Sequence, residues 1–257
     1  MLRKAHSLRG KKTMIDYLYD GTFEGFLNCV HAHYYQEKAS GVFQKESYQS
    51  TMLSNYCEVE TEEEKALIVY KAIEEKISSF DLRRIYRVFL SSAENKENIL
   101  LDYIRLGFIE GGKVSLFHGN PYVHAVQQVE KKVTFEVHRM AGLVRFSVLE
   151  GEILYCPLEP DHDILELIAG HFSDRFKCDP FIIHDKRRNK ALVAQNNSWY
   201  ITQFTDDNLP KLSENEKEYR RLWKSYFENI AIKERVNPRC QKNFMPVRYW
   251  KNLTEMR

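Results

Sequence analysis

The sequence predicts an α+β fold: an antiparallel sheet of about five strands packed with helices, plus an inserted helical subdomain at about residues 45–141. Three observations predict it. Apolar residues recur at helical spacing from residue 60 to about 141, and the pattern changes to period two from Leu143 onward. Turn residues then separate further strand-like segments. With 257 residues and 43% hydrophobic content, residues 14–257 can form a single domain.

The first predicted elements are a strand and a helix that meet at a tight turn. Residues 15–19 are β-branched and aromatic, and Asp20-Gly21 ends the strand. Thr22 is expected to cap an amphipathic helix from Phe23 to about Tyr35.

The predicted insert consists of four helices. "TEEE" at 61–64 is a capping-box sequence, and Leu67, Tyr70, Ile73 and Ile77 are expected to be buried after it. Further helices are expected at about 81–91, at about 97–109, and from Asn120-Pro121 to Gly142.

The C-terminal half alternates strands and helices. A hairpin is expected from 143–149 and 152–157, and a capping box at 163–166 opens a helix. Three strands follow at 181–185, 191–195 and 198–204, and a last long helix opens at Ser213 with Glu216 at the box position. The expected buried residues of that helix are Leu222, Trp223, Tyr226, Phe227 and Ile230.

Composition and motifs exclude several classes of protein. No stretch is long and apolar enough for a membrane span or a signal peptide, so we expect a cytoplasmic protein without membrane contact. Five scattered cysteines suggest neither disulfides nor a metal site. Walker, dinucleotide, G-x-S-x-G and H-E-x-x-H motifs are missing from the sequence, and we expect no cofactor.

Both ends of the chain are basic. Residues 1–13, expected to be a disordered leader, carry five Lys/Arg and no acid, and residues 211–257 carry 12 basic and 6 acidic side chains. Such ends fit a polyanion partner, because phosphate neutralisation releases counterions, and they fit a solvated surface equally well.

Two groups of residues are candidates for acid–base catalysis. Asp20 and Glu24 flank the strand-to-helix corner, where they can also act only as helix-capping charges. His171 lies three and four residues before Asp174 and Arg175, a spacing typical of a tuned acid–base site and, more often, of a structural ion pair.

Three segments are candidates for nucleic-acid contact, although charged turns and snorkelling tails are ordinary alternatives. The first is a turn around Gly142 that carries His138, Arg139 and Arg145. The second is the hairpin tip "KRRNK", with Lys186, Arg187, Arg188 and Lys190. The third is the C-terminal segment, with Arg239, Lys242, Arg248, Lys251, Phe244, Tyr249 and Trp250.

Four stretches carry a resemblance to a known family. "YDGTFEGFL", "HRMAGLVRFSVLEGEILYCPLEPDHDILELIAGHFSDRF", "PFIIHDKRRNKALV" and "MPVRYWKNLTE" together resemble an uncharacterised bacterial family described as probable DNA metabolism protein. Its members look like companions of a putative DNA modification or repair radical-SAM protein, and some are fused to a uracil-DNA-glycosylase-like domain. The resemblance supplies no established catalytic residues. It allows only these candidates to be carried over: Asp20, Glu24, His138, Arg145, His171, Asp174, Arg175, Asp185 and Arg187.

Three functions remain open at this point. The leading hypothesis is a DNA repair or modification accessory protein that binds DNA and acts with a radical-SAM partner, because this chain lacks the cysteine triplet of such an enzyme. The second is an enzyme acting on nucleotides or DNA, with His171 or Glu24 as acid–base and Arg145 or Arg175 on phosphate. The third is an assembly factor without DNA contact.

Overall fold

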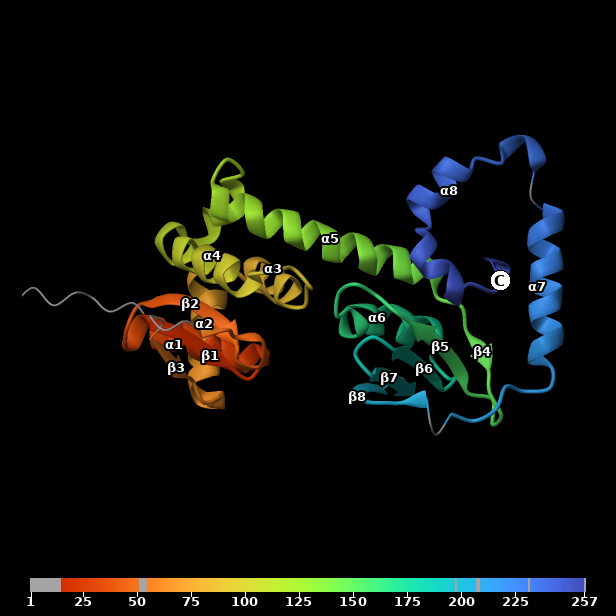
Figure 1. Cartoon of the computed structure of the whole chain (residues 1–257), viewed down its shortest axis with the longest axis horizontal. Helices are drawn as coiled ribbons and strands as arrows, with labels where there is room; N and C mark the ends of the chain where they lie inside the picture. Colours follow the sequence, from red (N-terminus) through yellow and green to blue (C-terminus); the bar gives the residue numbers. More distant parts are fainter. Residues whose placement is uncertain (1–14, 51–54, 197, 207–208, 231, 257) are drawn as a thin grey trace, which may run out of the picture. The chain divides into compact units, whose positions relative to one another are not determined.

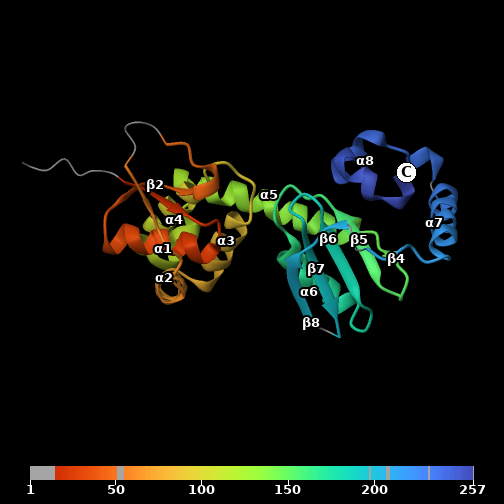
Figure 2. The ribbon, with the colours of Figure 1, turned by 60° about the horizontal axis from the view of Figure 1, so that its bottom comes forward.

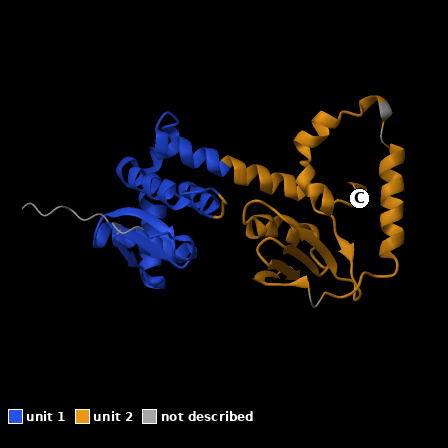
Figure 3. Cartoon of the chain, in the orientation of Figure 1, with its two compact units in different colours: residues 1–89, 93–130 blue, residues 90–92, 131–257 orange. Residues whose placement is uncertain are grey.

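The chain forms two compact units, which are described separately below (Figure 3). The computed structural model describes residues 15–50, 55–196, 198–206, 209–230 and 232–256. Unit 1 comprises residues 1–89 and 93–130, and unit 2 comprises residues 90–92 and 131–257. The leader expected at 1–13 lies outside the described residues. The expectation of a single domain stays a prediction, since compactness does not test whether the units fold independently.

Unit 1 combines a small parallel sheet with a group of helices (Figures 1 and 2). The sheet has the order β2-β1-β3, and β1 pairs in parallel with both neighbours. Its elements are β1 (Ile15–Tyr19), α1 (Phe23–Tyr35), β2 (Ala39–Gln44), η1 (Lys45–Ser47), β3 (Tyr56–Glu58), α2 (Glu63–Lys76), α3 (Ser79–Phe89), α4 (Lys96–Glu110), η2 (Gly111–Leu116) and the first part of α5 (Pro121–Leu143). Neither β2 nor β3 is predicted from the sequence.

The strand-to-helix corner at the start of unit 1 is confirmed. Thr22 caps α1 by accepting the N–H of Gly25 at 3.0 Å. Asp20 holds the corner, because it accepts the Thr22 hydroxyl at 2.6 Å and the Thr61 hydroxyl at 2.9 Å. Burial raises the pKa of Asp20, but these hydrogen bonds outweigh burial and leave the pKa below its usual value.

A buried polar network joins three helices of unit 1. Asp81 is fully buried and accepts hydrogen bonds from Tyr103 Oη at 2.7 Å and Ser78 Oγ at 2.6 Å. Arg84, also buried, reaches Asp81 at 3.4 Å and Glu130 at 2.7 Å. Because every charge in the network has a partner, the network stabilises the packing of α3, α4 and α5.

Unit 2 is built around a five-stranded mixed sheet, so the prediction of a purely antiparallel sheet is wrong. The order is β4-β5-β6-β7-β8, and β5 and β6 pair in parallel (Figure 1). The physical reason is the helix between them, because a parallel pair requires a crossover connection and α6 supplies it. The elements are the rest of α5, β4 (Ser147–Val148), β5 (Leu154–Leu158), α6 (Leu165–Arg175), β6 (Phe181–Asp185), β7 (Lys190–Gln195), β8 (Ser198–Gln203), α7 (Glu216–Ile230), η4 (Lys233–Arg235), α8 (Pro238–Phe244), η5 (Val247–Asn252) and η6 (Thr254–Met256).

The core of unit 2 lies where α5 and α6 pack against the sheet. Buried side chains of α6, such as Ile168 and Phe172, lie in one cluster with Ile183 of β6 and Leu192 of β7. The end of the chain joins the same cluster through Tyr249 of η5. The core therefore recruits residues from both ends of the unit.

The first two predicted capping boxes do not place their first residue at the helix cap, because the N-cap residues are Glu62 and Ile164 and neither side chain caps its helix. Thr61 donates instead to Asp20, and Asp163 forms an ion pair with Lys190 at 2.9 Å. The Glu216 carboxylate accepts a backbone N–H of β4 at 2.9 Å. In each case a long-range partner replaces the local one that the motif predicts.

Several apolar residues that were predicted to be buried are exposed. Leu67 and Tyr70 of α2 are 50% and 40% exposed. On α7 the predicted core face is exposed along its length, which comprises Leu222, Trp223, Tyr226, Phe227 and Ile230. An amphipathic pattern shows that a helix has an apolar face, but it does not identify what covers that face.

Replacing Asp81 with alanine is expected to destabilise unit 1 by about 3 kcal/mol, because it breaks a buried ion pair and leaves the Tyr103 hydroxyl without its acceptor. Urea unfolding measures the change. The control is Asp102→Ala, whose exposed pair with Arg105 contributes less than about 1 kcal/mol. Equal losses in the two variants would contradict the role of the network.

Acidification from pH 7.5 to 5.5 is expected to lower the free energy of unfolding. Burial lowers the pKa of His33 in unit 1 and of His184 in unit 2. At pH 5.5 the unfolded chain therefore binds more protons than the folded chain, which favours unfolding. The lost stability returns as pH rises through the ordinary histidine pKa of about 6.5. Unfolding midpoints at the two pH values test this, and His33→Asn, which keeps an acceptor for the Ala39 N–H, should flatten the dependence.

Candidate functional site

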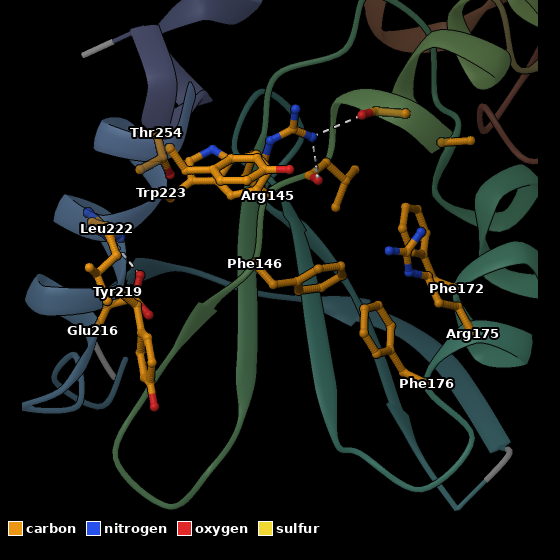
Figure 4. A pocket seen from close by; sticks show the side chains of 15 residues that line it. Arg145, Phe146, Phe172, Arg175, Phe176, Glu216, Tyr219, Leu222, Trp223 and Thr254 are labelled. Carbon is orange, nitrogen blue, oxygen red and sulfur yellow. Dashed lines mark hydrogen bonds and ion pairs between the residues drawn. The ribbon is translucent and has the colours of Figure 1, made fainter. Parts of the chain in front are cut away.

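The larger candidate site is a cavity of about 740 Å³ in unit 2, lined by arginines and aromatic rings (Figure 4). It lies between the end of α5 and the segment that follows it, the end of α6, one face of α7, and η6. We refer to it as the arginine–aromatic cavity. Its charged and aromatic lining residues are Arg145, Arg175, Glu216, Arg220, Phe146, Phe172, Phe176, Tyr219, Trp223 and Tyr226.

Arg145 is held in place by the end of the chain. Its guanidinium donates to both carboxylate oxygens of Glu255, at 2.7 and 3.3 Å, and to the Gly142 carbonyl at 2.9 Å. Trp223 Nε1 donates to the same carboxylate at 3.1 Å. Burial raises the pKa of Glu255, but the hydrogen bonds from Arg145 and Trp223 outweigh burial and keep the pKa below its usual value. The carboxylate thus stays charged and fixes both cavity residues.

The other two arginines differ in how strongly they are engaged. Arg220 donates to Glu216 at 2.7 Å and to the Ser147 hydroxyl at 2.6 Å, which ties α7 to β4. Arg175 is exposed and forms no ion pair with any residue that the structure describes; its guanidinium lies 5.7 Å from the ring centre of Phe176. Arg175 is therefore available to an incoming anion.

Aromatic rings form two groups in this cavity. Phe146 packs edge-on against Phe172 and Phe176, with ring centres at 5.6 and 4.9 Å (Figure 4). On α7, Trp223 and Tyr226 stack at 5.8 Å and remain 41% and 57% exposed. Cations beside accessible rings are the combination that binds phosphate and a stacked base together.

A second cavity of about 360 Å³, also in unit 2, brings together residues from five segments. We refer to it as the α5 cavity, because α5 lines one side with Lys132, Phe135, Glu136 and Arg139. The other lining residues are Ser92, Asp161, His162, Arg187 and Arg248.

The buried carboxylate of Glu136 holds other segments of the α5 cavity in place. It is 3% exposed and accepts the backbone N–H groups of Asp161 and His162 at 2.9 and 2.8 Å, together with the Tyr249 hydroxyl. Both of its oxygens thus accept hydrogen bonds from the protein, and its charge is buried with partners rather than presented to a ligand. The segment that follows β5 and the segment η5 are both held against α5 by this one side chain.

The basic hairpin tip is paired with carboxylates of unit 2. Each of its four cations pairs with a carboxylate: Lys186 with Asp206 at 2.6 Å, Arg187 with Asp161 at 3.1 Å, Arg188 with Asp185 at 2.8 Å, and Lys190 with Asp163 at 2.9 Å. Arg188 also donates to the Asp161 carbonyl at 2.6 Å. Of these four cations, Arg187 alone lines one of the two cavities described above, so the tip acts mainly as a structural corner.

Two of the three C-terminal aromatic residues are engaged within unit 2, whereas Phe244 is exposed. Tyr249 is 3% exposed, so its ring is not available for stacking, and the Trp250 indole donates to the Met245 carbonyl at 2.8 Å. On α8, Arg239 is exposed and Lys242 is exposed as well, and neither lines a described cavity. Arg248 lines the α5 cavity.

The turn around Gly142 does not form one anion pocket. Arg145 lines the arginine–aromatic cavity, Arg139 lines the α5 cavity, and His138 lines neither. The residues are close in sequence, but the end of α5 directs them to different surfaces of unit 2.

The candidates for acid–base catalysis line none of the cavities that the structure describes. Asp20 and Glu24 belong to unit 1, where Asp20 is a structural acceptor and Glu24 is exposed. His171 and Asp174 belong to unit 2, are exposed, and line neither cavity there. No hydrogen bond or ion pair joins His171 to Asp174 or Arg175 among the described contacts, so the expected ion-pair corner is not formed.

Sequence reasoning missed the most engaged residues of the α5 cavity. Glu136, His162 and Ser92 were not candidates, and neither was Lys132. A signal was present, because Lys132, Glu136 and Arg139 are four and three residues apart and therefore share one face of a helix. Ser92 and His162, by contrast, are 70 positions apart and meet only in the fold.

The fold and the site define a mixed α/β protein whose C-terminal unit carries two cation-lined cavities. Residues 94–255 match the family described as "Domain of unknown function (DUF4130)". This range is more than half of the chain, and the chain belongs to this family. The matched range, residues 94–255, includes every lining residue of both cavities except Ser92. No curated protein and no solved structure matches the sequence.

Among the described residues, no three His, Cys, Asp or Glu side chains are grouped as metal ligands. Within the same residues, no helix has both the length and the apolar character that crossing a membrane requires.

Replacing Arg188 with alanine is expected to destabilise unit 2 by about 1–3 kcal/mol, because it removes the charged partner of the fully buried Asp185. Lys186→Ala is the matched control in the same tip, since its exposed pair with Asp206 contributes about 1 kcal/mol or less. Urea unfolding compares the two variants, and an unchanged midpoint for Arg188→Ala would show that the tip is not a structural corner.

Proposed function

We propose that this protein is a DNA repair or modification accessory protein that binds nucleic acid through the arginine–aromatic cavity. The single observation that carries the proposal is the composition of that cavity. Three arginines and several aromatic rings line about 740 Å³, a volume within the range of about 300–1,000 Å³ that small ligands occupy.

The charge of the arginine–aromatic cavity supports an anionic ligand. Arg145 and Arg220 each pair with a glutamate, and these pairs fix the two guanidinium groups. Arg175 has no such partner in the described structure, so the cavity keeps a positive charge. A phosphate group approaching Arg175 replaces solvent without breaking an existing ion pair.

The rings support a stacked base as the rest of the ligand. Trp223 and Tyr226 are partly exposed on α7 and stack on each other, so a base added to Tyr226 extends an existing stack. Bases are accessible in single strands, loops and ends, whereas duplexes hide their faces. The proposal therefore favours single-stranded over double-stranded DNA.

The proposed protein partner is a radical-SAM protein. This half of the proposal rests on the resemblance of the quoted stretches alone. No described feature favours the alternative of an enzyme based on His171 and Asp174, because both residues lie outside the two cavities of unit 2.

Arg175→Ala is expected to weaken binding of a single-stranded oligonucleotide by about ten- to a hundredfold, because a charge-assisted contact to phosphate is worth about 1.5–3 kcal/mol. Fluorescence anisotropy across a salt series measures it, and the slope of log affinity against log salt should fall by about 0.7 for one lost phosphate contact. Arg221→Ala is the matched control, because Arg221 is exposed on α7 and outside the cavity.

The aromatic half of the cavity is tested in the same assay. Tyr226→Ala should weaken single-strand binding by about 1–3 kcal/mol with little change in the salt slope, since it removes a stacking surface and no charge. Phe244→Ala, an exposed ring of α8 outside the cavity, serves as control. Binding that is the same in Arg175→Ala, Tyr226→Ala and the parent protein would overturn the assignment to this cavity.

A further inference from the structure

The α5 cavity has a charge imbalance that its own residues do not correct. Four cations line it: Lys132, Arg139, Arg187 and Arg248. Only two carboxylates, Glu136 and Asp161, face them. With His162 neutral, the lining carries two more positive than negative charges.

The two carboxylates are already committed to the protein. Glu136 is buried and accepts two backbone N–H groups and a tyrosine hydroxyl, as described above. Asp161 is shared by two arginines, at 3.1 Å from Arg187 and 2.7 Å from Arg248. One carboxylate cannot neutralise two guanidinium groups, so donor capacity remains on both arginines.

The cations of α5 are less engaged still. Lys132 is exposed and has no ion pair with any residue that the structure describes. The described hydrogen bond of Arg139 goes to a neutral group, the Asn243 carbonyl, at 3.3 Å. Both side chains lie on the face of α5 that carries Glu136, because their spacing along the helix is seven residues.

His162 adds a neutral donor to the cavity. Its Nδ1 accepts the Ser92 N–H at 3.1 Å and lies 3.1 Å from the Ser92 hydroxyl. Because Nδ1 accepts from a backbone N–H, the proton of the neutral ring is on Nε2, where it can be donated to a ligand oxygen. Burial lowers the pKa of His162, although Glu136 and Asp161 oppose this effect, while Arg188 and Lys132 reinforce it.

We propose that the α5 cavity binds a phosphate monoester dianion, the group carried by a free nucleotide and by the terminal phosphate of a nucleic-acid strand. The dianion matches the two excess charges, whereas an internal phosphodiester carries one. Lys132, Arg139, Arg187 and Arg248 hold its oxygens, and His162 donates from Nε2. A volume of about 360 Å³ accommodates the phosphate and part of the attached nucleoside.

The test compares ligands that differ only in a terminal phosphate. The probes are one single-stranded oligonucleotide carrying a 5′-phosphate, a 3′-phosphate or hydroxyl ends, together with thymidine 5′-monophosphate and thymidine. One terminal phosphate should tighten oligonucleotide binding about tenfold, or the monophosphate should bind where thymidine does not. The first result assigns the ligand to strand ends, and the second assigns it to free nucleotides. If neither occurs, the proposal is wrong.

Variants assign the effect to the α5 cavity. Lys132→Ala and Arg139→Ala should each remove most of the phosphate-dependent difference, while Lys177→Ala, an exposed lysine that lines neither cavity, should keep it. Lys132 is exposed, so its replacement leaves the core intact, and near-ultraviolet circular dichroism verifies the fold. A phosphate-dependent difference that survives in both variants would overturn the assignment to this cavity.

The result is independent of the proposed function. Arg175→Ala should weaken phosphorylated and unphosphorylated oligonucleotides alike and leave their ratio unchanged. If the parent protein binds single strands but binds the phosphorylated and unphosphorylated oligonucleotides equally well, the phosphate site alone is rejected. If a terminal phosphate tightens binding but Arg175→Ala changes the affinity for neither oligonucleotide, the arginine–aromatic cavity alone is rejected.

Discussion

The buried carboxylate of Glu136 is the interaction on which the arrangement of unit 2 depends. A charge buried in a helix–sheet interface is tolerated only when its oxygens are satisfied, and here the backbone after β5 and the hydroxyl of Tyr249 satisfy them. These contacts bring the segment around Asp161 and the C-terminal η5 to the same face of α5. Asp161 then meets Arg187 and Arg248, and His162 meets Ser92. One carboxylate thus holds together the segments that line the α5 cavity, although these segments are far apart in the sequence.

Charge in this protein is informative only after its pairing is known. The hairpin tip from Lys186 to Lys190 is the densest basic feature of the described chain, yet each of its cations has a carboxylate partner. Arg175 and Lys132 lie outside that tip, and neither forms an ion pair with any residue that the structure describes. Both proposals for unit 2 rest on cations that have no acidic partner, and the number of basic residues in a segment does not identify them.

The same distinction applies to apolar patterns. Trp223 and Tyr226 have the spacing of core residues, but they form part of a cavity wall, where an exposed ring can contact a ligand. Tyr249 has the opposite fate, because a ring predicted to be available for stacking lies in the core with its hydroxyl on Glu136. Periodicity reports which residues share a face, whereas the partner of that face depends on packing between distant segments.

The sequence by itself determined the local features of this protein. The first strand, α1 and the Thr22 cap follow from residues within a few positions of one another, and so do the approximate helix positions from α2 to α5. Tertiary structure decided the features that join distant residues. The parallel pairing of β5 and β6, the neutralised tip and the two cavities are examples, since Arg145 meets Glu255 and Ser92 meets His162 across long stretches of chain. Local rules of turn, cap and spacing carry no information about such partners, because hydrogen bonds and ion pairs between distant residues form only when the core brings them together.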